Sequence, residues 1–143
     1  MSYLLDTNVI SELRKPAHRA SSAVRAWVAA RTPSDLHLSV MTILEVEVGI
    51  GRLGRRDTLQ ADRLRTWLED DLMGSFHGRI LAIDLPVARR AAQLHVPDPR
   101  PERDALIAAT AMTHGLTVVT RNVKDFDAFG LAIINPWEQA AGS

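Results

Sequence analysis

Tyr3-Leu4-Leu5-Asp6-Thr7-Asn8 stands near the start of the chain, and in it an acidic residue directly follows a short apolar run. Such a run is typical of a buried strand, and Thr7 and Asn8 are good helix N-cap residues, so a strand feeding a helix is predicted. Asp6 is then expected at the carboxyl end of that strand. Because a carboxylate loses hydration there, it needs partners or a metal ion, which favours a functional role.

Further strands are predicted where short apolar runs recur, at residues 36–38, 80–83, 116–120 and 131–134. The runs at 116–120 and 131–134 do not alternate between apolar and polar residues, as is typical of parallel strands buried on both faces. Apolar residues at helical spacing predict helices within residues 16–33, over 39–53 and over 56–76. Pro86 stands at a favoured first position of a short helix, and a further helix is predicted over residues 102–114, ended by Gly115. The alternation indicates an α/β fold with a doubly wound parallel sheet, whose ligand crevice lies outside the carboxyl ends of the strands.

One domain is expected from the length and the composition. The chain has 143 residues, of which 46% are hydrophobic, and a chain of this size buries about 70% of its unfolded surface. No linker or repeat divides it, so residues 1–138 are predicted to form a single domain and residues 139–143 a frayed tail. No apolar run approaches the ~18 residues of a membrane span, so we expect a soluble, cytoplasmic protein without a membrane partner.

Charge and composition disfavour several kinds of site. Seventeen basic residues balance seventeen acidic ones, so bulk charge gives no long-range attraction to nucleic acid. The chain has no cysteine, and its five histidines lack a paired ligand spacing, which excludes thiolate zinc sites and makes zinc an unexpected cofactor. The densest basic cluster, Arg52, Arg55 and Arg56, is interpreted as a solvated face, as are Arg14, Lys15, Arg100 and Arg103. Such residues would position phosphates only if they bordered an acidic crevice.

Three further acids follow positions that could explain them structurally. Glu45 comes three residues after Thr42, as in a capping box, and Asp104 and Asp125 come three residues after Pro101 and Asn122. Small residues follow Asp104 at positions 105, 108, 109 and 111, which would let its helix approach a neighbour closely. If the fold gathers these acids around Asp6, their mutual repulsion requires a hard cation, and the cluster predicts a divalent metal site.

Taken in order, four segments resemble the PIN-domain nucleases and, within them, the VapC-type toxins of bacterial toxin–antitoxin pairs, including the FitB-like branch. They are residues 5–11, 45–49, 104–111 and 120–126, and the likeness spans nearly the whole chain. It implies a PIN-like three-layer fold with a parallel, roughly five-stranded sheet flanked by helices. It also implies a homodimer and a cognate VapB-type antitoxin that blocks the acidic groove.

The same resemblance assigns the site. Asp6, Glu45 and Asp104 correspond to the family's three most regular acids, and Mg²⁺ or Mn²⁺ is the expected cofactor. The fourth position is assigned to Asp125, although some family members carry an aspartate where this chain has Asn122. The predicted catalytic and metal-binding residues are thus Asp6, Glu45, Asp104 and Asp125, supported by Thr7, Asn8, Thr120 and Asn122.

The resulting hypothesis is a metal-dependent endoribonuclease, the toxin of a type II toxin–antitoxin pair, that hydrolyses RNA phosphodiester bonds. An aspartyl phosphatase would use Asp6 as nucleophile but usually has a second acid two residues later, where Asn8 stands. A receiver-type signalling domain needs an acidic pair near the first strand and a lysine near the last, and neither is evident. The remaining alternative is a non-catalytic partner of a DNA-binding antitoxin in transcriptional autoregulation, which would meet DNA only through the antitoxin.

Overall fold

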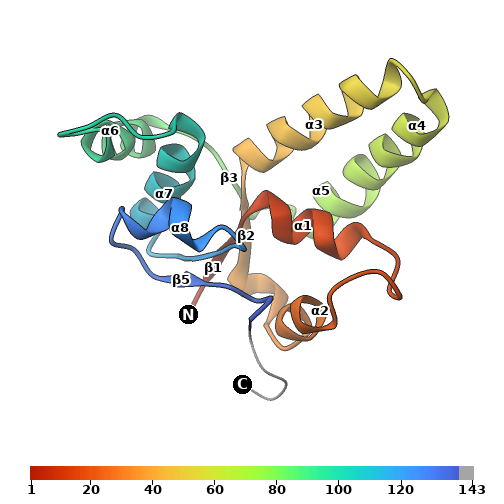
Figure 1. Ribbon diagram of the computed structural model, residues 1–143, viewed down its shortest axis with the longest axis horizontal. Coiled ribbons are helices and arrows are strands. Elements are labelled where there is room, and N and C mark those ends of the chain that lie inside the picture. The colour runs from red at the N-terminus through yellow and green to blue at the C-terminus, as the bar shows by residue number, and fades with distance from the viewer. Residues whose placement is uncertain (139–143) are drawn as a thin grey trace.

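Within residues 1–138, which the computed structural model describes, five parallel strands form one sheet in the order β3-β2-β1-β4-β5 (Figure 1). The strands are β1 (Tyr3–Leu5), β2 (Leu36–Ser39), β3 (Ile80–Leu81), β4 (Thr117–Val119) and β5 (Ile133–Ile134). The prediction of a five-stranded parallel sheet is confirmed. The predicted frayed tail, residues 139–143, lies outside the described residues.

The central strand β1 packs on both of its faces, which explains why its sequence does not alternate. Tyr3 and Leu5 belong to the apolar cluster on one face, and Leu4 belongs to the cluster on the other. Leu4 and Leu5 are 0% and 1% exposed. A strand whose successive side chains enter two cores is apolar throughout, as parallel sheets covered by helices require.

Helices cover each face and complete three layers (Figure 1). The face of Leu5 is covered by α1 (Thr7–Arg14), α2 (Ser22–Ala29), the long α3 (Val40–Gly54) and α4 (Thr58–Thr66). The face of Leu4 is covered by α7 (Glu102–His114) and α8 (Val123–Asp127), and α6 (Leu85–Leu94) packs against α7. No helix within residues 1–138 is long and apolar enough to cross a membrane.

The predicted continuous helix over residues 56–76 is interrupted. After α4 the chain forms a π-helical segment, Trp67–Leu72, and then the short helix α5 (Met73–Ser75). Leu64, Leu68 and Leu72 follow one another at four-residue spacing, which is wider than the 3.6 residues of an α-helical turn. The wider π turn keeps Leu68 and Leu72 on the core side, where they are 0% and 6% exposed.

Small side chains seat α7 between two neighbours, as the sequence predicted. Ala105 and Ala108 pack in the cluster with Leu4 of the sheet, while Ala109 packs against Val87 and Ala91 of α6. The helix ends at Gly115, whose φ of +66° lies in the left-handed region that glycine adopts without strain. This close seat fixes the first turn of α7, which carries Asp104, beside the end of β1.

Candidate functional site

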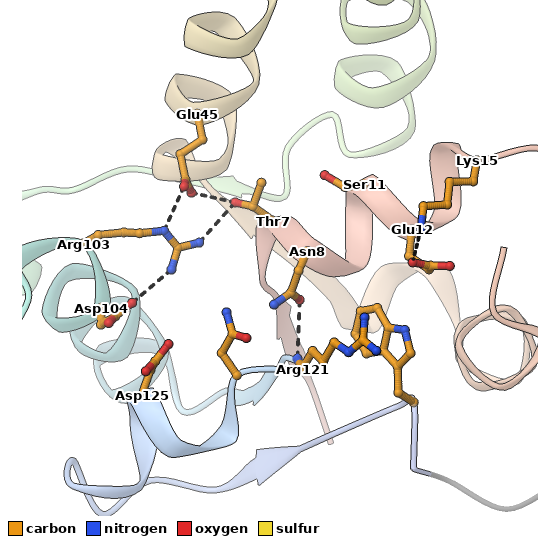
Figure 2. A pocket seen from close by; sticks show the side chains of 12 residues that line it. Thr7, Asn8, Ser11, Glu12, Lys15, Glu45, Arg103, Asp104, Arg121 and Asp125 are labelled. Atoms are coloured by element: carbon orange, nitrogen blue, oxygen red, sulfur yellow. Dashed lines mark hydrogen bonds and ion pairs between the residues drawn. The ribbon is translucent and has the colours of Figure 1, made fainter. Parts of the chain in front are cut away.

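A cavity of about 580 Å³ opens at the carboxyl edge of the sheet (Figure 2). Helices α1, α3 and α7 and the segment after β4 each contribute side chains to it. The lining residues are Thr7, Asn8, Ser11, Glu12, Lys15, Glu45, Arg103, Asp104, Arg121, Asn122, Asp125 and Trp137. The position agrees with the crevice expected outside the carboxyl ends of parallel strands.

Asp6 lies beneath this cavity and is completely buried, with 0% exposure. It is the N-cap of α1, and its Oδ1 accepts a 2.8 Å hydrogen bond from the Thr7 amide. Oδ2 accepts a 2.8 Å hydrogen bond from the Thr120 hydroxyl, at the end of β4. Thr7 and Asn8 therefore do not cap the helix, because the acid before them does.

Glu45 reaches the same place from α3. Its Oε1 accepts a 2.7 Å hydrogen bond from the Thr7 hydroxyl, whose oxygen lies 2.9 Å from the hydroxyl of Thr42. The N-cap of α3 is Ser39, so Thr42 and Glu45 lie inside the helix and form no capping box. The structural explanation that the sequence offered for Glu45 is therefore wrong.

Asp104 stands in the first turn of α7 and is mostly buried. Burial raises the pKa of its carboxyl, and the negative charges of Asp125 and Asp6 act in the same direction. A 3.1 Å hydrogen bond from Arg103 opposes this rise without cancelling it. Asp104 is thus an acid held in surroundings that disfavour its charge.

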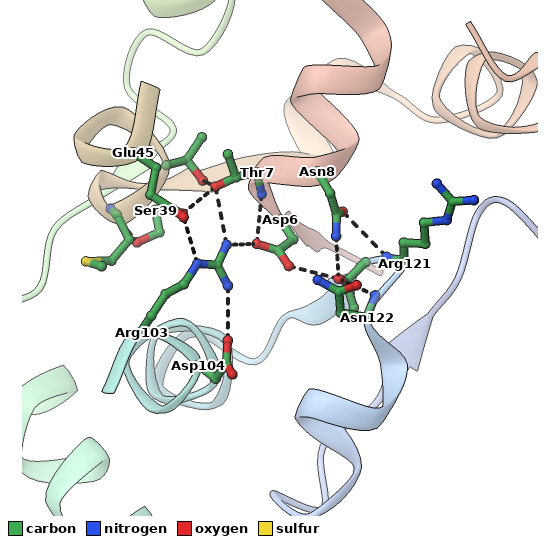
Figure 3. A network of polar contacts seen from close by, with 12 residues as sticks. Asp6, Thr7, Asn8, Ser39, Glu45, Arg103, Asp104, Arg121 and Asn122 are labelled. Atoms are coloured by element: carbon green, nitrogen blue, oxygen red, sulfur yellow. Dashed lines mark hydrogen bonds and ion pairs between the residues drawn. The ribbon is translucent and has the colours of Figure 1, made fainter. Parts of the chain in front are cut away.

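Arg103 contacts all three acids (Figure 3). The sequence-based interpretation of Arg103 as part of a solvated face is therefore wrong. Its Nη2 donates to Asp6 at 2.6 Å, its Nε to Glu45 at 2.9 Å and its Nη1 to Asp104 at 3.1 Å. Burial disfavours the guanidinium charge, but the hydrogen bonds and charges of Glu45 and Asp6 raise the pKa of Arg103 above its ordinary value. The only sequence signal for this was a basic residue directly before a predicted site acid.

The chemistry of the three acids suits a divalent cation, since carboxylate oxygens are the ligands that Mg²⁺ and Mn²⁺ take most readily. Their arrangement is nevertheless not that of a closed ligand cage. Among residues 1–138, no group of three His, Cys, Asp or Glu side chains is arranged to hold an ion, and the Arg103 guanidinium stands between the acids. The three acids are thus of the right chemical type to bind such an ion, but in this structure the Arg103 guanidinium lies between them.

Asp125 and Asn122 both line the cavity from the segment after β4. The Asp125 charge contributes to the raised pKa of Asp104, which places the two acids within electrostatic reach of each other. Asn122 is the N-cap of α8, although its side chain makes no capping hydrogen bond. Its backbone N–H donates a 3.0 Å hydrogen bond to the Thr120 hydroxyl. Thr120 also accepts a 3.2 Å hydrogen bond from Asn8 Nδ2, so Asn8 and Asn122 both support the residue that holds Asp6.

Basic and aromatic side chains border the acidic part of the cavity. The Arg121 guanidinium lies 5.2 Å from the centre of the Trp137 ring, and both residues line the cavity together with Lys15 (Figure 2). Trp137 is also partly buried against the core cluster on the Leu5 face of the sheet. A second cavity, of about 280 Å³, shares Thr7, Ser11 and Glu45 with the first and is bordered by Arg14 and Arg56. Arginines therefore do flank the crevice.

Comparison with known proteins gives consistent matches over nearly the whole chain. The model of the PIN domain family matches residues 3–130. VapC ribonuclease Y4jK of Sinorhizobium fredii is 40% identical, with 96% of this chain and 99% of that protein covered. Toxin FitB of Neisseria gonorrhoeae is 38% identical, with 94% and 97% covered.

Solved structures share this fold as well. The crystal structure of FitAcB from Neisseria gonorrhoeae superposes with a TM-score of 0.87 at 37% identity, covering 96% of this chain and 99% of that one. A toxin–antitoxin complex from Klebsiella pneumoniae superposes with a TM-score of 0.70 at 28% identity, covering 96% and 100%. These matches extend over the strands and helices that carry the site residues.

Proposed function

Because this chain belongs to the PIN domain family, we propose that it is a metal-dependent endoribonuclease and the toxin of a toxin–antitoxin pair. The observation that carries the proposal is the meeting of Asp6, Glu45 and Asp104, from three separate elements, within hydrogen-bonding distance of one cation. The names of the relatives, a VapC ribonuclease and a FitB toxin, support the same assignment.

The proposed site residues have distinct tasks. Asp6, Glu45 and Asp104 would hold Mg²⁺ or Mn²⁺, and Asp125 would hold a second ion or orient the attacking water. When bound, such an ion polarises the phosphodiester and lowers the pKa of water, which removes the need for a histidine base. None of the lining residues of the cavity is a histidine, in keeping with this chemistry.

Hydrogen bonds from neutral groups fix two of these acids, Asp6 and Glu45, in place. The Thr7 amide and the Thr120 hydroxyl hold the two oxygens of Asp6, and the Thr7 hydroxyl holds Glu45. An oriented carboxylate needs little reorganisation when a cation or a phosphate arrives, and this is the main protein contribution to such catalysis.

The cationic rim is suited to the RNA backbone. Lys15 and Arg121 line the cavity on the side away from Glu45, and the stacking of Arg121 on Trp137 restrains its guanidinium (Figure 2). We assign them to phosphate contacts, which position a strand without reading its sequence. Lys15 also pairs with Glu12 of the same cavity at 2.9 Å, so a phosphate would compete with that carboxylate for its ammonium group.

We further propose that a VapB-type antitoxin covers the acidic cavity and its arginine-bordered neighbour. The toxin–antitoxin complex among the structural matches supports this pairing. Contact with DNA would be made only through the antitoxin. The expected homodimer and the cytoplasmic location stay predictions.

The test is cleavage of a panel of labelled structured RNAs by purified, antitoxin-free protein in Mg²⁺ or Mn²⁺, with chelator and Asp104→Asn controls. The proposal predicts discrete cuts that both controls abolish. Intact RNA, together with tight binding of the antitoxin by folded protein, would instead favour a non-catalytic role in autoregulation.

A further inference from the structure

The three proposed metal ligands already have a cation, and it is part of the same chain. Arg103 places a different guanidinium nitrogen against Asp6, Glu45 and Asp104, at 2.6 Å, 2.9 Å and 3.1 Å (Figure 3). Such charge-assisted hydrogen bonds are roughly twice as strong as neutral ones. The guanidinium therefore satisfies a cluster of acids that would otherwise repel one another.

This arrangement competes with a divalent ion bound by the same three acids. Mg²⁺ and Mn²⁺ need oxygens converging to about 2.1 Å, whereas the guanidinium holds one oxygen of each acid around its own, wider edge. An ion at the centre of the three acids would draw on these oxygens and would meet the positive charge of the guanidinium, so the two cations compete for the site. Among residues 1–138, no three acidic side chains are arranged to hold an ion, in keeping with acids that are spread around the guanidinium.

Arg103 cannot leave by losing its proton, because a guanidinium stays charged at any physiological pH. It can leave by rotating, since its side chain is 31% exposed while that of Asp6 is 0% exposed. Its position in the first turn of α7, directly before Asp104, keeps the displaced guanidinium beside the cavity.

From these contacts we infer that Arg103 is an internal counter-cation that keeps the acid site closed to divalent metal until the metal displaces it. This inference concerns regulation of the proposed site and rests on the proposed metal use. Arg103 holds the metal-free acids together and lowers the apparent affinity of the site for metal. A higher metal concentration is therefore needed to fill the site than would be needed without Arg103.

The test is Mn²⁺ binding by metal-free protein, followed by the loss of the electron paramagnetic resonance signal of free Mn²⁺. Arg103→Ala and Arg103→Gln are compared with wild type and with Arg100→Ala, an exposed residue three positions earlier. The inference predicts at least tenfold tighter Mn²⁺ binding in both Arg103 variants and an unchanged dissociation constant in Arg100→Ala. Two different replacements guard against a folding defect in one of them.

A second measurement observes Arg103 directly in the wild-type protein. Its Nε–H donates to Glu45 in the metal-free state, so Mg²⁺ must shift its ¹H–¹⁵N resonance and weaken its protection from exchange with water. An unmoved resonance in metal-saturated protein, or equal Mn²⁺ affinity with and without Arg103, would overturn the inference and leave the nuclease proposal standing. Absence of Mn²⁺ binding in every variant would overturn both.

Discussion

The Thr120 hydroxyl donates a 2.8 Å hydrogen bond to Asp6 Oδ2 although the two residues stand 114 positions apart in the sequence. Both are fully buried, with 0% exposure. The hydroxyl also accepts hydrogen bonds from Asn8 Nδ2 and the Asn122 amide, so its one donor and both acceptor sites are used. The ends of β1 and β4 are thereby joined through one side chain.

Replacing Thr120 by Val keeps the shape and removes this hydroxyl. Because two donors and a buried carboxylate then lose a partner, we expect the free energy of unfolding to fall by about 1–3 kcal/mol. RNA cleavage should fall at least tenfold, since Oδ2 of Asp6 is then no longer held in place. Urea denaturation and initial cleavage rates measure the two effects. Thr120→Ser restores the hydroxyl and should recover most of both; wild-type cleavage by Thr120→Val would refute the positioning role.

Asp104→Asn should separate activity from stability. Cleavage should fall at least a hundredfold, because a proposed ligand loses its charge. The raised pKa means that folding disfavours the ionised carboxyl, so at pH 7 the metal-free variant should be as stable as wild type or more so. The difference should vanish below about pH 4, where the unfolded carboxyl is protonated too. Melting curves of both proteins between pH 4 and pH 7 measure this stability difference. A variant clearly less stable than wild type at pH 7 would contradict the prediction.

For Glu12 we expect the opposite effect of pH on the free energy of unfolding. Hydrogen bonds from the Lys15 ammonium at 2.9 Å and the Ser21 amide at 2.7 Å lower its pKa. Its contribution is therefore fully present above the unfolded pKa of about 4.3 and is lost as the pH falls through the lower folded value. Glu12→Gln should lower the free energy of unfolding at pH 7 by about 1–2 kcal/mol, and this gap should close in acid. Glu69→Gln, at an exposed position, serves as the control that should show no such gap.

Paired substitutions address the fourth site position. Asp125→Asn should reduce cleavage tenfold or more, since it removes a charge that acts on Asp104 within the same cavity. Asn122→Ala should have a smaller effect, because the contact of Asn122 with Thr120 is made by its backbone amide. Single-turnover rates with one RNA compare them. A larger loss in Asn122→Ala would move the fourth position to Asn122.

Much of the fold was predictable because its signals are local. The side chains of β1 enter two cores in turn, so the strand is apolar throughout. The acid that follows such an apolar run is easy to recognise in the sequence. The end of α7 at Gly115 was predicted for a local reason as well. The π turn over Trp67–Leu72 was missed because apolar periodicity alone does not distinguish a wider turn from a continuous α-helix.

The role of Arg103 was not predictable from spacing. An arginine in a first helical turn is usually solvated, and its three partners stand at positions 6, 45 and 104. Only the tertiary fold brings them to one guanidinium. The capping box suggested for Glu45 failed for a related reason, because Ser39, one turn earlier, already caps α3.

The most direct test of the account is the chemistry of the RNA ends left by the purified protein. Attack by water on phosphorus, with departure of the 3′-oxygen, leaves a 5′-phosphate and a 3′-hydroxyl, and this is what the carboxylate site predicts. The alternative, attack by the neighbouring 2′-hydroxyl, leaves a 2′,3′-cyclic phosphate and a 5′-hydroxyl. Ligation and mass analysis of the fragments identify the ends; cyclic phosphate ends would contradict the proposed use of this acid cluster.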